Sequence, residues 1–168
     1  MKKIGILIEN QFDEQELIYP YHRLREDYEV ILIGSQAGVE YAGKTGLKMK
    51  SDIASSDVDY RELSGLVIPG GFSPDFMRRT QATKDLVKEL DEAKTPMAAI
   101  CHGPWMFASS AEIAGKDMTS FFAIKDDLKN AGANWVDKEV VVSGHLVTSR
   151  TPKDLPIFIK TFIELVEE

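Results

Sequence analysis

The sequence has 168 residues, of which 43% are hydrophobic, 28% charged and 9% aromatic. This length predicts one domain over residues 1–168, and the apolar content excludes a disordered chain and argues against a two-domain enzyme. The 27 acidic and 20 basic residues give a net charge of −7, which repels phosphate backbones and argues against non-specific binding of nucleic acid.

The chain has a single cysteine, Cys101, so it forms no internal disulfide. The apolar run after Met1 is too short for a signal peptide, and no stretch approaches the roughly 20 apolar residues of a membrane span. We therefore expect a cytoplasmic protein that is not bound to a membrane. One cysteine and three scattered histidines lack the ligand spacing of a zinc site, so neither a metal nor another cofactor is expected.

The first third of the chain alternates between two periodicities. Residues 4–8 form a continuous apolar run, typical of a strand that is covered on both faces. A helix is predicted from Asp13, because apolar residues then recur at helical spacing and Glu16 completes a capping box. Pro20 lies inside this helix and should bend it or set its first turn apart. Residues 29–33 are a second predicted strand.

The middle of the chain continues the alternation. Residues 38–50 contain three glycines and predict a small antiparallel excursion. Residues 66–69 and 97–100 read as buried strands, and the spacing over 81–93 predicts a helix between them. Another helix is predicted to open at Gly103-Pro104, with proline at an early position.

The last third predicts a short helix, a hairpin and a final helix. The short helix covers residues 124–131, and strands 140–142 and 146–148 are separated by a hairpin-like spacing. Thr151 is a candidate N-cap for an amphipathic terminal helix, whose expected buried face is Phe158, Ile159, Phe162 and Val166. The whole pattern predicts an α/β fold: a doubly wound sandwich with a mostly parallel sheet, helices on both faces and a C-terminal hairpin.

Three chemically unusual loops follow predicted strands: residues 9–16, 69–75 and 100–105. Ligands of such sheets bind outside the carboxyl ends of the strands, so we expect these loops to converge on one crevice.

Cys101 lies between a predicted strand and a predicted helix, on a sharp turn of the kind that exposes a nucleophile. The amino end of the following helix favours thiolate, so we expect a reactive thiol with a pKa below the roughly 8.5 of a free cysteine. The alternative is a small buried hydrophobe. His102 is the adjacent candidate base, whereas His22 and His145 are expected to have plain surface or core roles.

Two further features have competing interpretations. Gly70 and Gly71 form either an ordinary tight turn or a turn whose backbone N–H groups hold an oxyanion. Glu16 is either a helix cap, in which case Glu16→Gln is nearly silent, or a carboxyl that tunes the thiol, in which case Glu16→Gln moves the thiol pKa.

Four blocks of this sequence, in order and spaced over nearly its whole length, together resemble the ThiJ/PfpI superfamily, and specifically its PfpI-like intracellular cysteine protease and glyoxalase/deglycase branch. They are ELIYP from Glu16, VIPGG from Val67, AICHGP from Ala99 and TSRTPKDL from Thr148. The resemblance implies a flavodoxin-like sandwich, a reactive cysteine at a nucleophile elbow and assembly into homodimers or hexamers.

The resemblance also assigns roles by motif. Cys101 resembles the family nucleophile, His102 its partner and Glu16 the carboxyl that contacts the thiol, while Gly70 and Gly71 resemble the oxyanion-binding turn. Asp75 matches the acid that orients the histidine from a neighbouring subunit, but relatives commonly have glutamate there. Relatives also often carry tyrosine at the position of Phe121.

Two classes of function follow. In the first, the Cys101 thiolate attacks a carbonyl carbon, either of a peptide or of a small aldehyde such as methylglyoxal or its adducts on proteins. Asp75 in place of the common glutamate and Phe121 in place of tyrosine slightly favour small aldehydes over peptides. In the second, the protein is a non-enzymatic stress-response redox sensor or chaperone that works through oxidation of Cys101.

Overall fold

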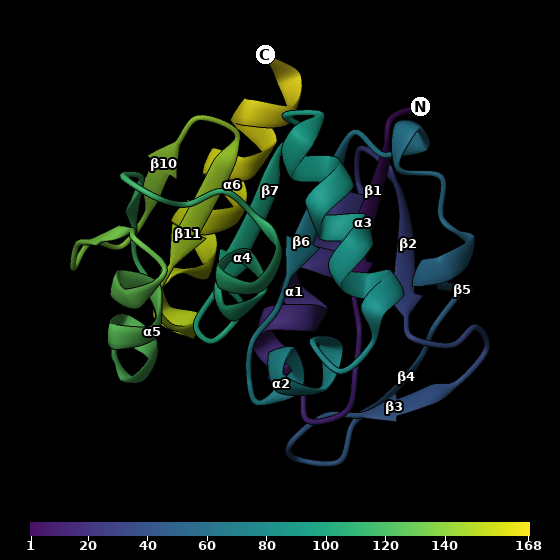
Figure 1. Cartoon of the computed structure of the whole chain (residues 1–168). Coiled ribbons are helices and arrows are strands. Elements are labelled where there is room, and N and C mark those ends of the chain that lie inside the picture. Colours follow the sequence, from purple (N-terminus) through teal and green to yellow (C-terminus); the bar gives the residue numbers. More distant parts are fainter.

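The computed structural model describes all 168 residues and is built on a seven-stranded sheet with the order β10-β11-β7-β6-β1-β2-β5 (Figure 1). Neighbouring strands are parallel throughout, except β10 with β11. The strands are β1 (Lys3–Leu7), β2 (Glu29–Gly34), β5 (Ile53–Ala54), β6 (Gly65–Ile68), β7 (Met97–Ile100), β10 (Val141–Ser143) and β11 (Leu146–Ser149). The expected doubly wound α/β fold is confirmed.

Helices cover both faces of this sheet. In Figure 1, α3 and α4 lie in front of the strands, and α1 and α6 lie behind them. The helices are α1 (Glu14–Arg25), α2 (Ser73–Met77), α3 (Gln81–Glu92), α4 (Trp105–Ser110), α5 (Lys125–Asn130) and α6 (Leu155–Glu167). Short 3₁₀ turns add Ser55–Asp57, Tyr60–Glu62, Phe122–Ile124 and Pro152–Asp154. None of these helices is long and apolar enough to cross a membrane.

The strand residues divide between two cores because successive side chains point to opposite faces of a sheet. Ile4, Ile6 and Ile8 join the core beneath α1 and α6, whereas Leu7 joins the core beneath α3 and α4. Both kinds of position are almost fully buried, which explains why β1 is a continuous apolar run in the sequence. On α6 the expected apolar face is buried, as predicted: Phe158, Ile159, Phe162 and Val166.

Two small accessory sheets flank the main one. The predicted antiparallel excursion is confirmed: β3 (Glu40–Ala42) pairs with β4 (Lys48–Lys50). The second pair, β8 (Asp117–Met118) with β9 (Asn134–Trp135), is parallel and was not predicted, because two-residue strands leave no periodic signal. Helix α2 was also missed, since its five residues lie inside a segment that reads as a loop.

The expected cap of the terminal helix is wrong. Thr151 makes no side-chain cap, and a 3₁₀ turn over Pro152–Asp154 precedes α6. The carboxylate of Asp154 accepts hydrogen bonds from the backbone N–H of Arg150 (3.0 Å) and from its Nε (2.9 Å). A charged, forked pairing therefore holds this turn in place of a hydroxyl cap.

The parallel strands all end at the lower edge of the sheet in Figure 1, where α2 and the β3–β4 hairpin also lie; both termini lie at the opposite edge. β1 and β6 are neighbours, but the chain leaves them toward opposite faces, so the sheet has its topological switch point between them. Ligand crevices of doubly wound sheets open at this place.

His145 is 8% exposed and has a core role, as expected. It directly precedes β11, away from the carboxyl end of that strand, and makes a buried polar contact there. Its Nε2 lies 2.7 Å from Oδ1 of Asp91 on α3, and Oδ2 of Asp91 accepts the backbone N–H of Glu112 (2.9 Å). Asp91 thus joins α3 to the β10–β11 hairpin and to the segment after α4.

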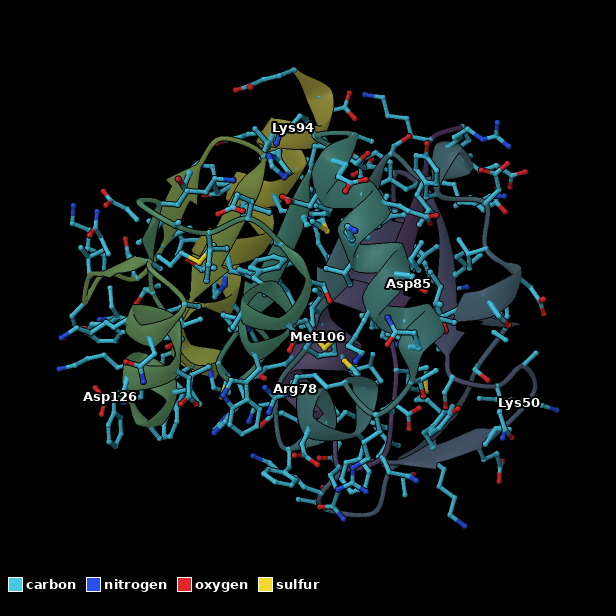
Figure 2. All side chains as sticks on the ribbon, in the orientation of Figure 1. Lys50, Arg78, Asp85, Lys94, Met106 and Asp126 are labelled. Carbon is cyan, nitrogen blue, oxygen red and sulfur yellow. The ribbon has the colours of Figure 1, made fainter.

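Asp91→Ala should lower the free energy of unfolding by about 2–4 kcal/mol, because it leaves the buried His145 and the N–H of Glu112 without their acceptor. Urea denaturation at neutral pH measures this loss. The matched control is Asp85→Ala on the same helix, where the carboxylate is exposed (Figure 2) and its change should be within about 0.5 kcal/mol. Equal losses in the two variants would contradict the structural role of Asp91.

Candidate active site

Cys101 lies at a strained turn between β7 and α4, at the carboxyl edge of the sheet. Its φ is 63°, a left-handed conformation that is uncommon for a residue with a side chain. Gly103 makes the turn possible, because a Cβ at this position would lie 2.5 Å from the carbonyl oxygen of Ile68. The backbone holds Cys101 in a conformation that is unfavourable in isolation, as is common at functional sites. The expected sharp turn is confirmed.

The glycine turn after β6 brings the loop after β1 against Cys101. Gly71 has a φ of 68°, and a Cβ there would lie 2.3 Å from the carbonyl oxygen of Gln11. A Cβ on Gly70 would lie 2.9 Å from the Cβ of Cys101. Both positions therefore require glycine for close approach of three chain segments, which is more than an ordinary tight turn needs.

Glu16 is fully buried at the start of α1 and faces this turn. Its Oε1 accepts the N–H of Gly70 at 2.8 Å, and its carboxyl lies beside Cys101, since a Cβ on Gly70 would meet both Oε1 of Glu16 (2.7 Å) and the Cβ of Cys101 (2.9 Å). The predicted capping box is only half formed: Oδ1 of Asp13 accepts the N–H groups of Gln15 (3.0 Å) and Glu16 (3.2 Å), but Glu16 does not reach back. Glu16 is therefore directed at the thiol and not at the end of its own helix.

The contact between Glu16 and Gly70 changes the expected use of the glycine turn. The N–H of Gly70 donates to Glu16 and is not free to hold an oxyanion. The backbone N–H groups directed at the sulfur of Cys101 belong to His102 and Gly71. The pair of available donors is thus Gly71 and His102, and not Gly70 and Gly71.

Burial raises the pKa of Glu16 to about 8, and the negative charge of Asp13 adds to this effect. Burial also raises the pKa of Cys101, to about 12, with the charge of Glu16 as the second cause. The expectation of a thiol pKa below that of free cysteine is therefore wrong, chiefly because the sulfur is buried. Each group therefore opposes ionisation of the other in their common buried space.

His102 follows Cys101 on the turn, and its Nδ1 lies 3.3 Å from Sγ of Cys101. Its ring stacks on Phe121 (5.1 Å between centroids) and meets Trp105 edge-on (5.1 Å). Burial lowers the pKa of His102, and the positive charge of Lys44 lowers it further. The imidazole is therefore neutral at pH 7 and has a nitrogen within reach of the sulfur.

Cys101, Glu16 and His102 line an open cleft of about 480 Å³. Most of its other lining residues are polar, and Phe72 and Phe121 add aromatic surface. Phe121 presents no hydroxyl to the cleft, as expected from the sequence. The size suits a small molecule or the side chain of a peptide.

The structure does not bring Asp75 to His102 within one chain. Asp75 lies on α2 and accepts a hydrogen bond from Nη2 of Arg79 at 2.7 Å. The site also contains a charged residue that sequence reasoning missed, Lys44, which lines the cleft and pairs with Asp13. Only a glycine-rich turn marked its segment, so no local signal identified Lys44.

Residues 2–165 match the DJ-1/PfpI family. The chain belongs to this family. The match to the DJ-1/PfpI family extends over the cysteine turn, the glycine turn and Glu16, and agrees with the resemblance found in the sequence.

The relatives whose names state an activity fall into two groups. The chain is 44% identical over 167 residues to the putative cysteine protease YraA of Bacillus subtilis, with 99% of each chain covered. It is 39% identical over 166 residues to the deglycase PfpI of Pyrococcus furiosus, with 98% of this chain and 99% of the relative covered. Similar proteins with a named activity are thus a putative cysteine protease and a deglycase.

Solved structures of the DJ-1/PfpI family share the fold. A two-domain protein of Anabaena variabilis with DJ-1/ThiJ/PfpI-like and ferritin-like domains superposes with a TM-score of 0.95 at 39% identity, and the match covers 97% of this chain and 49% of that one. DJ-1beta of Drosophila melanogaster gives a TM-score of 0.90 at 27% identity, covering 99% of this chain and 91% of that one.

The buried carboxyl of Glu16 makes stability depend on pH. Its pKa is about 4.5 in the unfolded chain and about 8 in the folded protein, so folding is favoured by this group below pH 4.5 and loses that contribution as pH rises to 8. At about 1.4 kcal/mol per pH unit the loss amounts to a few kcal/mol. Glu16→Gln should abolish this loss, as measured by urea denaturation across that pH interval.

In Glu16→Gln the thiol pKa should fall, because the Coulombic repulsion disappears while the amide still accepts from Gly70. The rate of iodoacetamide alkylation against pH measures this pKa. Glu26→Gln, at the exposed end of the same helix, is the control and should leave both curves unchanged. Wild-type curves for both stability and alkylation in Glu16→Gln would show that Glu16 does not tune the thiol and only accepts the N–H of Gly70.

Proposed function

We propose that this protein is a cysteine-dependent enzyme in which Cys101 attacks the carbonyl carbon of a small 2-oxoaldehyde such as methylglyoxal, or of its adducts on proteins. The observation that carries the proposal is the strained turn that presents Cys101 to the cleft, with Nδ1 of His102 3.3 Å from its Sγ and the buried carboxyl of Glu16 in the same cleft. Relatives named deglycase support an aldehyde, and a relative named putative cysteine protease keeps a peptide carbonyl as the second substrate class.

The addition step is balanced within the site. A bond forms between Sγ of Cys101 and the carbonyl carbon, and the electron pair of the C=O bond moves to oxygen. The N–H groups of Gly71 and His102, which point at the sulfur, lie next to the place where this oxyanion develops. The S–H bond of Cys101 breaks, and its proton, relayed by the carboxyl of Glu16, neutralises the oxyanion and gives a hemithioacetal.

His102 supports the later proton transfers. Because burial lowers its pKa, the neutral imidazole accepts a proton from the substrate and returns it to a neighbouring atom or, with a peptide, to the leaving amine. The stacked ring of Phe121 fixes the plane of the imidazole. A base in fixed orientation beside the attacked carbon fits both substrate classes.

The proposal includes a homodimer or hexamer in the cytoplasm. His102 has no acid partner within its own chain, and Asp75 pairs with Arg79 at the surface of α2. We place Asp75 of the partner subunit at the free nitrogen of His102, as the resemblance implies. An acid at this position orients the imidazole and stabilises its protonated form during turnover.

A second candidate function is a redox sensor. Oε2 of Glu16 is buried and has no hydrogen-bond partner, and a protonated carboxyl at this place would donate to a cysteine sulfinate. In this case peroxide adds two oxygen atoms to Cys101, and no substrate is turned over.

The two functions separate in one pair of assays on wild type and Cys101→Ser. As an enzyme, the wild type converts methylglyoxal or a peptide substrate, and Cys101→Ser loses at least about 10³-fold in kcat/KM because the hydroxyl is a much weaker nucleophile. Mass spectrometry after a low dose of peroxide detects the two oxygen atoms that the sensor hypothesis adds to Cys101. Sulfinate formation without turnover of either substrate would reject the enzyme.

Asp75→Asn should lower kcat by about 10-fold or more while KM changes little, because the acid acts on the histidine and not on the substrate. Sedimentation of the same samples measures their oligomeric state. Arg79→Gln is the control, since it removes the surface partner of Asp75 and leaves the acid in place. A fully active monomer on dilution would remove Asp75 from the mechanism.

A further inference from the structure

Lys44 is the one lysine or arginine that lines the cleft around Cys101. It lies at the tip of the β3–β4 hairpin, outside the main sheet, and its side chain is 50% exposed. Its Nζ forms an ion pair with Oδ2 of Asp13 at 2.6 Å, and its backbone N–H donates to the carbonyl of Phe12 at 3.0 Å. Two contacts therefore hold the residue against the loop that precedes α1.

The hairpin tip itself is fixed on α1 by Glu14. Oε2 of Glu14 accepts the backbone N–H of Thr45 at 2.9 Å, its hydroxyl at 2.5 Å and the N–H of Leu47 at 3.4 Å. Gly43 packs against this carboxylate so closely that a Cβ would lie 2.5 Å from Oε2. The position of Lys44 over the cleft is therefore set by side chains and does not depend on a free loop.

The charges that face the thiol come from three elements. Asp13 and Glu16 lie at the start of α1 and are both acidic, and His102 on the elbow is neutral at pH 7. Lys44 on the hairpin is the opposing charge. Asp13 raises and Lys44 lowers the pKa of Glu16, so the two act on the carboxyl and thiol in opposite directions.

We propose that Lys44 is a positioning residue of the active site, whose ammonium group, held by Asp13, supplies the countercharge that allows a thiolate to form on Cys101 beside Glu16. The inference rests on the proposed function of Cys101 as nucleophile. Without Lys44 a thiolate would form beside Asp13 and Glu16 with no cation in the cleft. The hairpin is then part of the catalytic apparatus, although it contributes nothing to the main sheet.

The test is the pH dependence of Cys101 alkylation by iodoacetamide in single variants. Lys44→Met should move the thiol titration to higher pH by about half a unit to one unit, less than for a closely paired buried charge because Lys44 is half exposed. Alkylation at a fixed pH below the midpoint then slows roughly three- to tenfold. Asp13→Asn, which keeps a helix-capping side chain, should move the titration to lower pH.

Three further variants make the result specific to the charge. Lys44→Arg should restore the wild-type profile, and Lys44→Gln should reproduce the shift of Lys44→Met if that variant folds poorly. Lys50→Met, on the same hairpin and extending outward from β4 (Figure 2), should leave the profile unchanged. Circular dichroism of each sample checks that the hairpin change has not unfolded the protein.

The inference is overturned if both neutral variants of Lys44 titrate like wild type, or if Asp13→Asn and Lys44→Met shift the curve in the same direction. Alkylation reports the thiol itself and does not require turnover. A shifted profile in a protein that converts neither aldehyde nor peptide therefore rejects the proposed function and keeps the role of Lys44. Loss of turnover in Cys101→Ser together with an unchanged alkylation profile in Lys44→Met supports the proposed function and rejects the role of Lys44.

Discussion

The hydrogen bond from the N–H of Gly70 to Oε1 of Glu16 connects the segments that follow the neighbouring strands β1 and β6 at their carboxyl ends. Everything else in the site is arranged around it. A side chain at residue 70 would meet both Glu16 and Cys101, so glycine alone allows the carboxyl and the thiol to share a buried space. The bond also occupies one carboxyl oxygen and leaves the other for the thiol, which gives Glu16 an orientation that a helix cap does not need.

Burial of this pair decides its chemistry. Two acidic groups in one poorly solvated space cannot both ionise easily, and the pKa values of Glu16 and Cys101 are both raised. The helix amino terminus, which the sequence suggested as the activator of the thiol, is outweighed because α4 has only six residues and the desolvation of the sulfur is large. A thiolate in this site depends on the carboxyl keeping its proton.

The fold was largely predictable from the sequence because each buried strand carries a run of apolar residues and each long helix a period of 3.6. Helix α2 and the β8–β9 pair were not, since elements of two to five residues carry no period. In the site, Cys101 and Glu16 stood out because each follows a buried strand closely. Lys44 did not, because its place over the cleft comes from contacts of Glu14 and Asp13 with a distant hairpin, which no local pattern encodes.

The neutral state of His102 explains why a cation from elsewhere matters. In many cysteine enzymes an imidazolium next to the sulfur stabilises the thiolate. Here the ring is enclosed by Phe121 and Trp105, and its lowered pKa leaves it uncharged at neutral pH. The histidine is then free to accept a proton, but the negative charge on the sulfur must be balanced by backbone N–H groups and by Lys44. Because aromatic rings enclose His102 and keep it neutral, it can act as a base, and the positive charge near the sulfur comes from a separate residue, Lys44.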